Sequence, residues 1–210
     1  MTFVADTINF REIVMKEPLP LAVIQTAVID FLRGRDDGVL FGAQAVSVYV
    51  AEPRATQDVD VISTRAKELA EELRAHLAEL FHIALRVREI KSGAGYRIFQ
   101  VRKTGNRHLV DIRSVDSMPQ SERLDGVLVL SPAALIASKV VSYRNRLGKP
   151  KAGTDWRDIA LLVLTFPQLK CDPGPVTECL RAATGDEQVL ALWRDLVAQK
   201  IEPENEDDDF

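Results

Sequence analysis

Two aspartates spaced to share one face of a strand are the feature of this sequence with the clearest chemical meaning. Asp58 and Asp60 lie in the alternating, β-branched stretch 58–62. Successive side chains of a strand point to opposite faces, so both carboxylates project from one side while Val59 and Val61 point into the core. Like charges this close repel each other unless a cation neutralises them. The pair therefore predicts a site for Mg²⁺, which typically uses one or two carboxylates together with substrate phosphates.

A third carboxylate can join this pair. Asp111 stands between the apolar residues Val110 and Ile112, in a stretch that we expect to form a neighbouring strand. That pattern directs Asp111 toward the face that carries the other two acids. Three carboxylates can hold two metal ions, one activating an attacking hydroxyl and one steadying a leaving pyrophosphate. The alternative reading of Asp111 is a plain surface acid.

A place for phosphate groups is expected next to the acids. Gly42 and Ala43 open a predicted helix that runs to about residue 49. The first turn of a helix offers unpaired N–H groups and the positive end of the helix dipole, and glycine lets a substrate approach the backbone. Arg54 follows this helix. Its side chain either binds a triphosphate or packs over a loop.

Candidate site residues also occur in the second half of the chain. Lys139 lies on an otherwise apolar helical face, where a lysine is unusual unless its ammonium reaches solvent or meets an anion such as a phosphate. Asp155 and Asp158 are one helical turn apart, beside Arg157. They either pair within their own helix or support Lys139 and the substrate.

The elements that position these residues divide the chain near residue 130. Before it, the patterns predict helices and strands in alternation, and the last strands before residue 113 look antiparallel. Ser63 or Thr64 is expected to cap the helix 65–81, and Ser131-Pro132 to begin the first helix of the second half. The expected strands are 39–41, 58–62, 83–90, 96–103, 107–113 and 126–130, and the expected helices are 19–33, 42–49, 65–81, 132–147, 154–165, 174–183 and 186–199.

Composition and charge are those of an ordinary water-soluble protein. Of the 210 residues, 46% are hydrophobic and 28% are charged, which excludes a largely disordered chain. No window approaches 18 uncharged apolar residues, and the N-terminus carries acids where a signal peptide would be basic and apolar. We therefore expect no contact with a membrane and a cytoplasmic location.

The last ten residues form a strongly acidic end. They hold six acids and no base, and without them the net charge of −4 becomes +2. Such an end is expected to be a disordered, solvated tail, and the alternative is an acidic arm that occupies a basic groove.

With these residues in place, the sequence resembles the DNA polymerase β-like nucleotidyltransferase superfamily. The signature of that superfamily is a hydrophobic residue, Gly and a small residue, followed after a short gap by Asp-x-Asp; here Phe41-Gly42-Ala43 precedes Asp58-Val59-Asp60. The longer match over residues 38–165 looks like the AbiEii-type toxin branch. It includes Pro53-Arg54-Ala55-Thr56 before the two acids, and then Ser131-Pro132, Lys139, Arg144, Arg146, Asp155 and Asp158.

The resemblance implies an α+β protein with the nucleotidyltransferase fold, made of a mixed-sheet N-terminal lobe (1–130), an all-helical C-terminal lobe (131–200) and the acidic tail (201–210). It implies a Mg²⁺- or Mn²⁺-dependent transfer of a nucleoside monophosphate from an NTP to an acceptor hydroxyl. Asp58 and Asp60 would be metal ligands and Asp111 a ligand or base. Lys139 would join the catalytic group, and Gly42, Ala43, Arg54, Lys139, Asp155 and Asp158 would bind the nucleotide.

The resemblance further implies a toxin with a cognate antitoxin, acting on tRNA or on a protein. Two other functions stay open: a non-catalytic nucleotide- or partner-binding module of the same fold, and a small-molecule nucleotidyltransferase of the antibiotic-resistance kind. One departure bears on this choice. Ala43 replaces the Gly or Ser common at its position, which removes a hydroxyl group from the phosphate site. The basic run 144–151 is either a solvated loop or a track for an RNA backbone.

Overall fold

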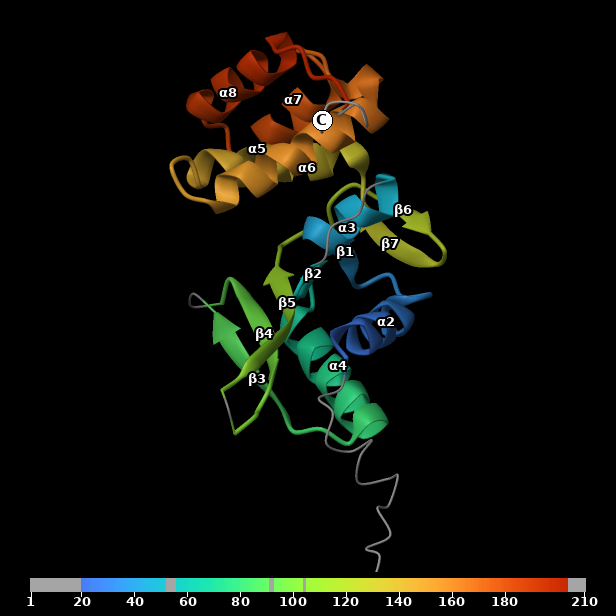
Figure 1. Ribbon diagram of the computed structural model, residues 1–210. Coiled ribbons are helices and arrows are strands. Elements are labelled where there is room, and N and C mark those ends of the chain that lie inside the picture. Colours follow the sequence, from blue (N-terminus) through green and yellow to red (C-terminus); the bar gives the residue numbers. More distant parts are fainter. Residues whose placement is uncertain (1–19, 52–55, 91–92, 104, 204–210) are drawn as a thin grey trace, which may run out of the picture.

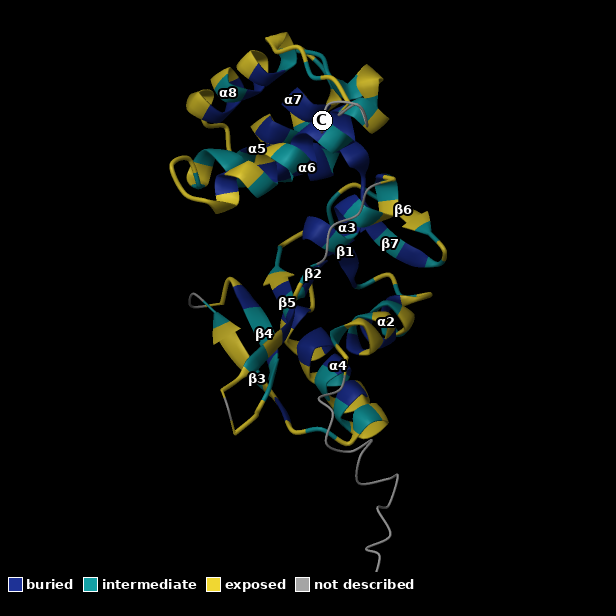
Figure 2. Ribbon diagram, viewed as in Figure 1, coloured by how far each residue is buried: buried dark blue, intermediate teal, exposed yellow. Residues whose placement is uncertain are grey.

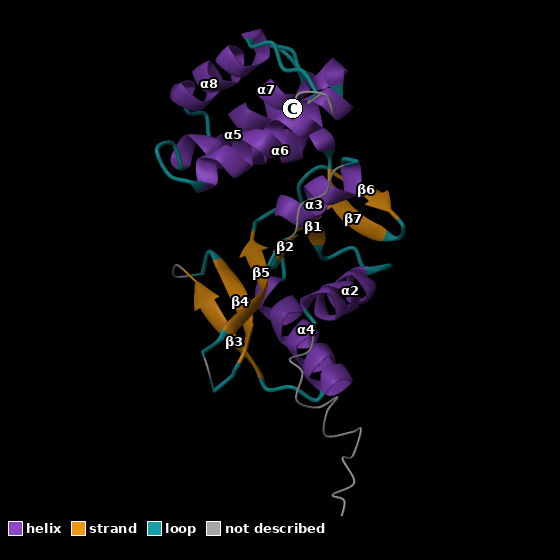
Figure 3. Ribbon diagram, viewed as in Figure 1, coloured by secondary structure: helices purple, strands orange, loops and turns teal. Residues whose placement is uncertain are grey.

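The computed structural model describes residues 20–51, 56–90, 93–103 and 105–203. The strands gather with three helices in one part of the molecule, and the remaining helices form the other part (Figures 1 and 3). Seven strands make a single sheet in the order β3-β4-β5-β2-β1-β7-β6. The architecture is therefore the α+β arrangement expected from the sequence.

The elements of the sheet-containing part are α2 (Leu21–Leu32), β1 (Val39–Phe41), α3 (Gly42–Tyr49), β2 (Val59–Ser63), α4 (Ala66–Phe81), β3 (Leu85–Ile90), β4 (Gly95–Gln100), β5 (Arg107–Ser114), β6 (Ser121–Leu124) and β7 (Val127–Leu130). The helical part comprises α5 (Pro132–Asn145), α6 (Lys151–Thr165), the short 3₁₀ helix η1 (Pro167–Leu169), α7 (Pro175–Ala183) and α8 (Glu187–Ala198). Most of these bounds agree with the sequence patterns to within three residues.

The sheet is mixed, and its pairing places the acids side by side. β3, β4 and β5 are antiparallel neighbours, as the sequence indicated. β5 and β2 run parallel, with Asp111 opposite Asp60. β2 and β1 are antiparallel, with Asp60 opposite Phe41. Because β1 ends where α3 begins, this pairing brings the start of α3 to the aspartates.

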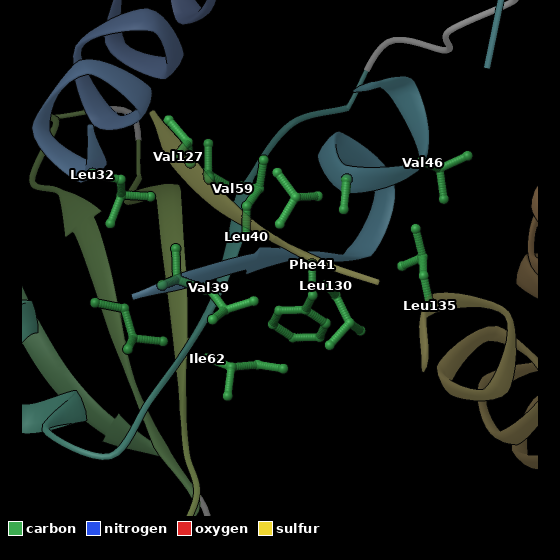
Figure 4. Close-up of a cluster of buried hydrophobic side chains, with 14 of the residues drawn as sticks. Leu32, Val39, Leu40, Phe41, Val46, Val59, Ile62, Val127, Leu130 and Leu135 are labelled. Atoms are coloured by element: carbon green, nitrogen blue, oxygen red, sulfur yellow. The ribbon is translucent and has the colours of Figure 1, made fainter. Parts of the chain in front are cut away.

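An apolar core fixes the strands beneath the site. Figure 4 shows it reaching from Leu32 on α2, across Val39, Leu40 and Val59 of the central strands, to Leu135 on α5. The three-residue strand β1 is fully buried, as expected for a strand covered on both faces. Burial is densest along this central region and falls toward the outer strands (Figure 2).

The helical part is built around α5. This helix contacts α6, α7 and α8, while α3 touches both α5 and α6. Trp193 of α8 is completely buried within this part. The change from strands to helices falls at residues 130–132, as expected. The division into two domains there stays a prediction.

Several local features differ from the sequence-based expectations. The N-cap of α4 is Arg65 rather than Ser63 or Thr64, and it makes no side-chain capping bond. β6 was not predicted; it pairs with β7 through the tight turn Asp125-Gly126, where both residues have positive φ (47° and 82°). α6 begins at Lys151 rather than near residue 154, because burial of Ala152 offsets the low helix propensity of Gly153. Ser131 precedes α5, but its hydroxyl group makes no capping bond and finds no partner in the described part of the chain.

Two expectations fall outside the described residues. Arg54 belongs to residues 52–55, and most of the acidic tail belongs to residues 204–210. Among the helices that are described, none has the length and apolar character needed to cross a membrane.

Candidate active site

The three predicted aspartates converge. Asp58 immediately precedes β2, Asp60 lies within β2, and Asp111 lies opposite it on β5. One carboxylate oxygen from each residue lies within 4.8 Å of the other two. All three side chains keep partial contact with solvent. Strand alternation thus aligns Asp58 with Asp60, and the parallel pairing of β2 with β5 adds Asp111.

Gly42 allows the helix start to lie directly against these acids. Its φ of +72° belongs to the left-handed region, which other residues adopt at a cost. A Cβ atom at this position would overlap Oδ2 of Asp60 and would lie 2.9 Å from its Cγ. Glycine is therefore required both by the backbone conformation and by the close approach of α3 to Asp60.

The carboxyl group of Asp60 has a shifted pKa. Burial, together with the neighbouring charges of Asp58 and Asp111, raises the pKa of Asp60 to about 6, against the opposing effect of Lys139 and Arg113. The charges of Asp58 and Asp111 therefore repel that of Asp60. A divalent cation among the three acids would relieve this repulsion.

Arg97 on β4 holds the third acid. Its Nε donates to Oδ1 of Asp111 and its Nη2 to Oδ2, both at 2.6 Å. Arg113, two residues after Asp111, places its guanidinium 4.6 Å from the ring centre of Phe41. The sequence analysis singled out neither arginine. Arg97 could have been identified only with knowledge of the strand register, because it lies directly opposite Asp111 on the adjacent antiparallel strand.

A buried network of charges from α5 and α6 faces the acids. Lys139 donates a hydrogen bond to Asp158 at 2.6 Å, and its ammonium lies 4.0 Å from Asp155. Arg146 pairs with the other oxygen of Asp155 at 2.7 Å. The three buried side chains of this network expose 7% or less of their surface.

This network revises the expectation for Lys139. On its apolar helical face, Lys139 was expected either to reach solvent or to meet an anion such as a phosphate. The structure supplies Asp158 as one such anion, with Asp155 nearby. Of the roles expected for Asp155 and Asp158, the structure shows support of Lys139. A contact between Lys139 and a phosphate stays a prediction.

A cavity of about 370 Å³ joins these groups. It brings together most of the residues expected from the sequence: Gly42, Ala43, Asp58, Asp60, Asp111, Lys139 and Asp155. It also includes Arg146 and Lys151 of the basic run 144–151, and five polar side chains that the sequence patterns did not indicate: Arg97, Arg113, Ser138, Ser142 and Thr154. Asp158 is fully buried and does not line the cavity, and its hydrogen bond with Lys139 connects it to a residue that does.

The donor set fits a hard divalent cation. Three carboxylates supply only oxygen ligands, and their spacing brings an oxygen of each within reach of a shared ion. The start of α3 lies directly against Asp60, whose carboxylate occupies the space that a side chain at position 42 would need. Residues Asp58, Asp60 and Asp111 could therefore hold Mg²⁺ or Mn²⁺, with α3 directing its first N–H groups toward the same space.

Comparison with solved structures identifies the fold. The chain is similar to the Megavirus polyadenylate synthase, with a TM-score of 0.57 and 15% identity over 72% of this chain and 32% of that one. It is similar to a protein of H. pylori provisionally described as a nucleotidyltransferase (TM-score 0.53, 14% identity, 84% and 92% coverage). It is also similar to the antibiotic-resistance factor ANT(2'')-Ia (TM-score 0.51, 16% identity, 84% and 96% coverage).

These similarities show a nucleotidyltransferase fold, as the sequence motifs predicted. The chain spans about a third of the length of the viral synthase but nearly the whole length of the other two proteins. No protein-family model matches the chain. No curated protein matches it either.

Proposed function

We propose that this chain is a metal-dependent nucleotidyltransferase that moves a nucleoside monophosphate from an NTP to an acceptor hydroxyl. The observation that carries the proposal is the contact between Gly42 and Asp60 within the cluster of three acids. It places a helix N-terminus, which suits phosphates, directly beside a set of metal ligands. The fold shared with the viral polyadenylate synthase and ANT(2'')-Ia supports the same reading.

In this proposal the phosphates lie between the start of α3 and the helical part. Backbone N–H groups at Gly42 and Ala43 bind them, so the missing hydroxyl at position 43 does not remove the phosphate site. Lys139 faces them from α5, held by Asp158 and Asp155. The network fixes the ammonium without exposing it to bulk water, which strengthens its interaction with an anion.

The reaction forms one bond and breaks one. The oxygen of the acceptor hydroxyl attacks the α-phosphorus, and the bond from that phosphorus to the β-phosphate oxygen breaks, so that pyrophosphate leaves with the electron pair. Asp58 and Asp60 are metal ligands, and Asp111 is the third ligand or the group that accepts the hydroxyl proton. Bound Mg²⁺ or Mn²⁺ would neutralise phosphate charge and favour ionisation of the attacking hydroxyl.

The finer assignment is that the chain is the toxin of a toxin–antitoxin pair that acts on tRNA or a protein in the cytoplasm. Its support is the series of AbiEii-type motifs between residues 38 and 165, and the cytoplasm supplies the NTP. Within that series, Lys139, Arg146, Asp155 and Asp158 form one connected network in the structure. A cognate antitoxin would bind the same protein.

A second candidate is a small-molecule nucleotidyltransferase. Its support is the similarity to ANT(2'')-Ia over 84% of this chain, together with the polar walls of the cavity. In that case the acceptor hydroxyl belongs to a polyhydroxylated small molecule that enters between Asp111 and α5.

The test is incubation of the purified chain with each α-³²P-labelled NTP and Mg²⁺ in three parallel reactions. One contains total cell RNA, one contains cell protein and one contains a panel of aminoglycosides. Label on RNA or protein supports the first candidate, and label on an aminoglycoside supports the second. The matched control is Asp60→Asn, which removes one ligand charge while keeping the side-chain size. Absence of label in every reaction, with bound NTP still detected by equilibrium dialysis, would favour a non-catalytic binding module.

A further inference from the structure

The contact between Arg97 and Asp111 has a consequence for the metal site. Two parallel N–H···O bonds at 2.6 Å occupy both oxygens of the Asp111 carboxylate. Bidentate pairs of this kind are among the stronger hydrogen bonds in proteins. The Arg97 side chain is 30% exposed and lines the site cavity.

A cation bound by Asp111 would have to share an oxygen with Arg97 or displace it. Sharing would hold a divalent ion close to a guanidinium, and these two positive charges repel. Displacement would cost the bidentate pair. Either way, Arg97 opposes binding at the third acid, whereas Asp58 makes no such bidentate contact in the described part of the chain.

A second cavity next to Arg97 offers space for its guanidinium group. Arg97 lines the site cavity and also this second cavity of about 280 Å³. Among the described residues, the wall of that second cavity includes Arg86, Arg88 and His108, but no acid. A guanidinium released from Asp111 would therefore remain at the border of the site, where a phosphate could replace the carboxylate as its partner.

The geometry points to Arg97 as a positioning residue that competes with the metal ion for Asp111. Without metal, Arg97 neutralises Asp111 and limits the repulsion within the acid cluster. When a metal ion takes Asp111, Arg97 leaves that carboxylate and becomes available to an anionic group of the substrates. This inference rests on the metal site of the proposed function.

The experiment is titration of the nucleotide-free chain with Mn²⁺, followed by the electron paramagnetic resonance signal of the free ion. Wild type is compared with Arg97→Gln and with Arg88→Gln. Arg88 lies directly opposite Arg97 on the neighbouring strand and is exposed, so its replacement removes the same charge one strand further from the acids. We expect Arg97→Gln to bind Mn²⁺ about 10- to 100-fold more tightly, the cost of one hydrogen-bonded charged pair. Arg88→Gln should stay within about threefold of wild type, as expected for an exposed charge.

Equal or weaker Mn²⁺ binding by Arg97→Gln would refute the proposal that Arg97 competes with the metal ion for Asp111. It would mean that Asp111 keeps Arg97 while it binds metal, or that Arg97 helps to form the site. Arg97→Lys provides a second variant if the first does not fold. It keeps the charge but cannot form the two-pronged contact, so we expect an affinity between those of wild type and Arg97→Gln.

Thermal unfolding gives an independent readout. In EDTA, Arg97→Gln should melt below wild type because the acids lose a counter-charge, and saturating Mn²⁺ should raise its Tm more than that of wild type. A wild-type chain that binds no Mn²⁺ would refute the metal site itself. Normal binding by wild type with no change in Arg97→Gln would refute only the role of Arg97.

Discussion

Replacement of Gly42 by alanine tests the contact on which the proposed site depends. At φ +72° an alanine pays about 1–2 kcal/mol for the left-handed conformation. The added Cβ would also overlap Oδ2 of Asp60 and crowd its Cγ at 2.9 Å. Moving the carboxylate or the start of α3 adds an estimated 1–2 kcal/mol. We therefore expect Gly42→Ala to lose roughly 2–4 kcal/mol of folding free energy and to bind the metal ion more weakly.

The assay combines thermal unfolding in EDTA with Mn²⁺ titration. For a chain of this size, a loss of 2–4 kcal/mol lowers Tm by roughly 5–15 °C. The matched control is Gly153→Ala on α6, where no atom lies within 4 Å of the added Cβ and φ is not positive. That variant should gain about 0.5–1 kcal/mol, because alanine favours the helix.

A double variant separates the two causes. In Gly42→Ala/Asp60→Ala the overlap with the carboxylate disappears, while the strain at φ +72° remains. The two substitutions should thus be less damaging together than the sum of their separate effects. Unchanged Tm and Mn²⁺ affinity in Gly42→Ala would refute the reasoning, since the backbone there could then accept a side chain without displacing Asp60.

Three further outcomes are expected. Asp60→Asn should abolish labelling yet raise the Tm of the metal-free protein at pH 7 by roughly 5 °C. It removes a charge whose burial, together with repulsion by Asp58 and Asp111, raises the pKa of Asp60 to about 6; undiminished labelling would exclude the mechanism. Lys139→Met should weaken NTP binding about 10- to 100-fold, which nucleotide titration measures, and equal NTP affinities would remove Lys139 from the site. Because it also leaves the buried Asp158 without this cation, it should cost about 3–5 kcal/mol of folding free energy, which urea unfolding measures. Hydrogen bonds from Arg35 hold the pKa of Asp37 below its ordinary value of 3.8, so this pair stabilises the fold above that pH and ceases to do so as the pH falls through the lower, folded-state pKa. Arg35→Gln should therefore flatten the loss of stability as the pH falls below the ordinary Asp pKa of 3.8, and an unchanged pH profile would contradict this.

Local pattern was enough to predict most of the elements and the central acids. Alternation over residues 58–62 determines that Asp58 and Asp60 share a face, and this holds wherever the strand is placed in the sheet. A glycine at the start of a helix, before the acids, similarly indicated where α3 begins. β6 (Ser121–Leu124) escaped prediction because three of its four residues are polar or charged, and because it pairs along one edge only. Its position follows from the turn at Asp125-Gly126 rather than from its own composition.

The partners of each charge could not be predicted, because they depend on register and packing between distant segments. Lys139 and Asp158 are 19 residues apart and meet only because α5 and α6 pack together. Arg97 and Asp111 meet because β4 and β5 pair with one particular offset, and the register shifts next to this pair, between Ile98 and Phe99. Shifting β4 by one residue would turn Arg97 toward the opposite face and leave Asp111 without this partner. The acids and Lys139 were therefore readable from the sequence, whereas Arg97 and Arg113, which also lie beside the acids, became visible only in the folded chain.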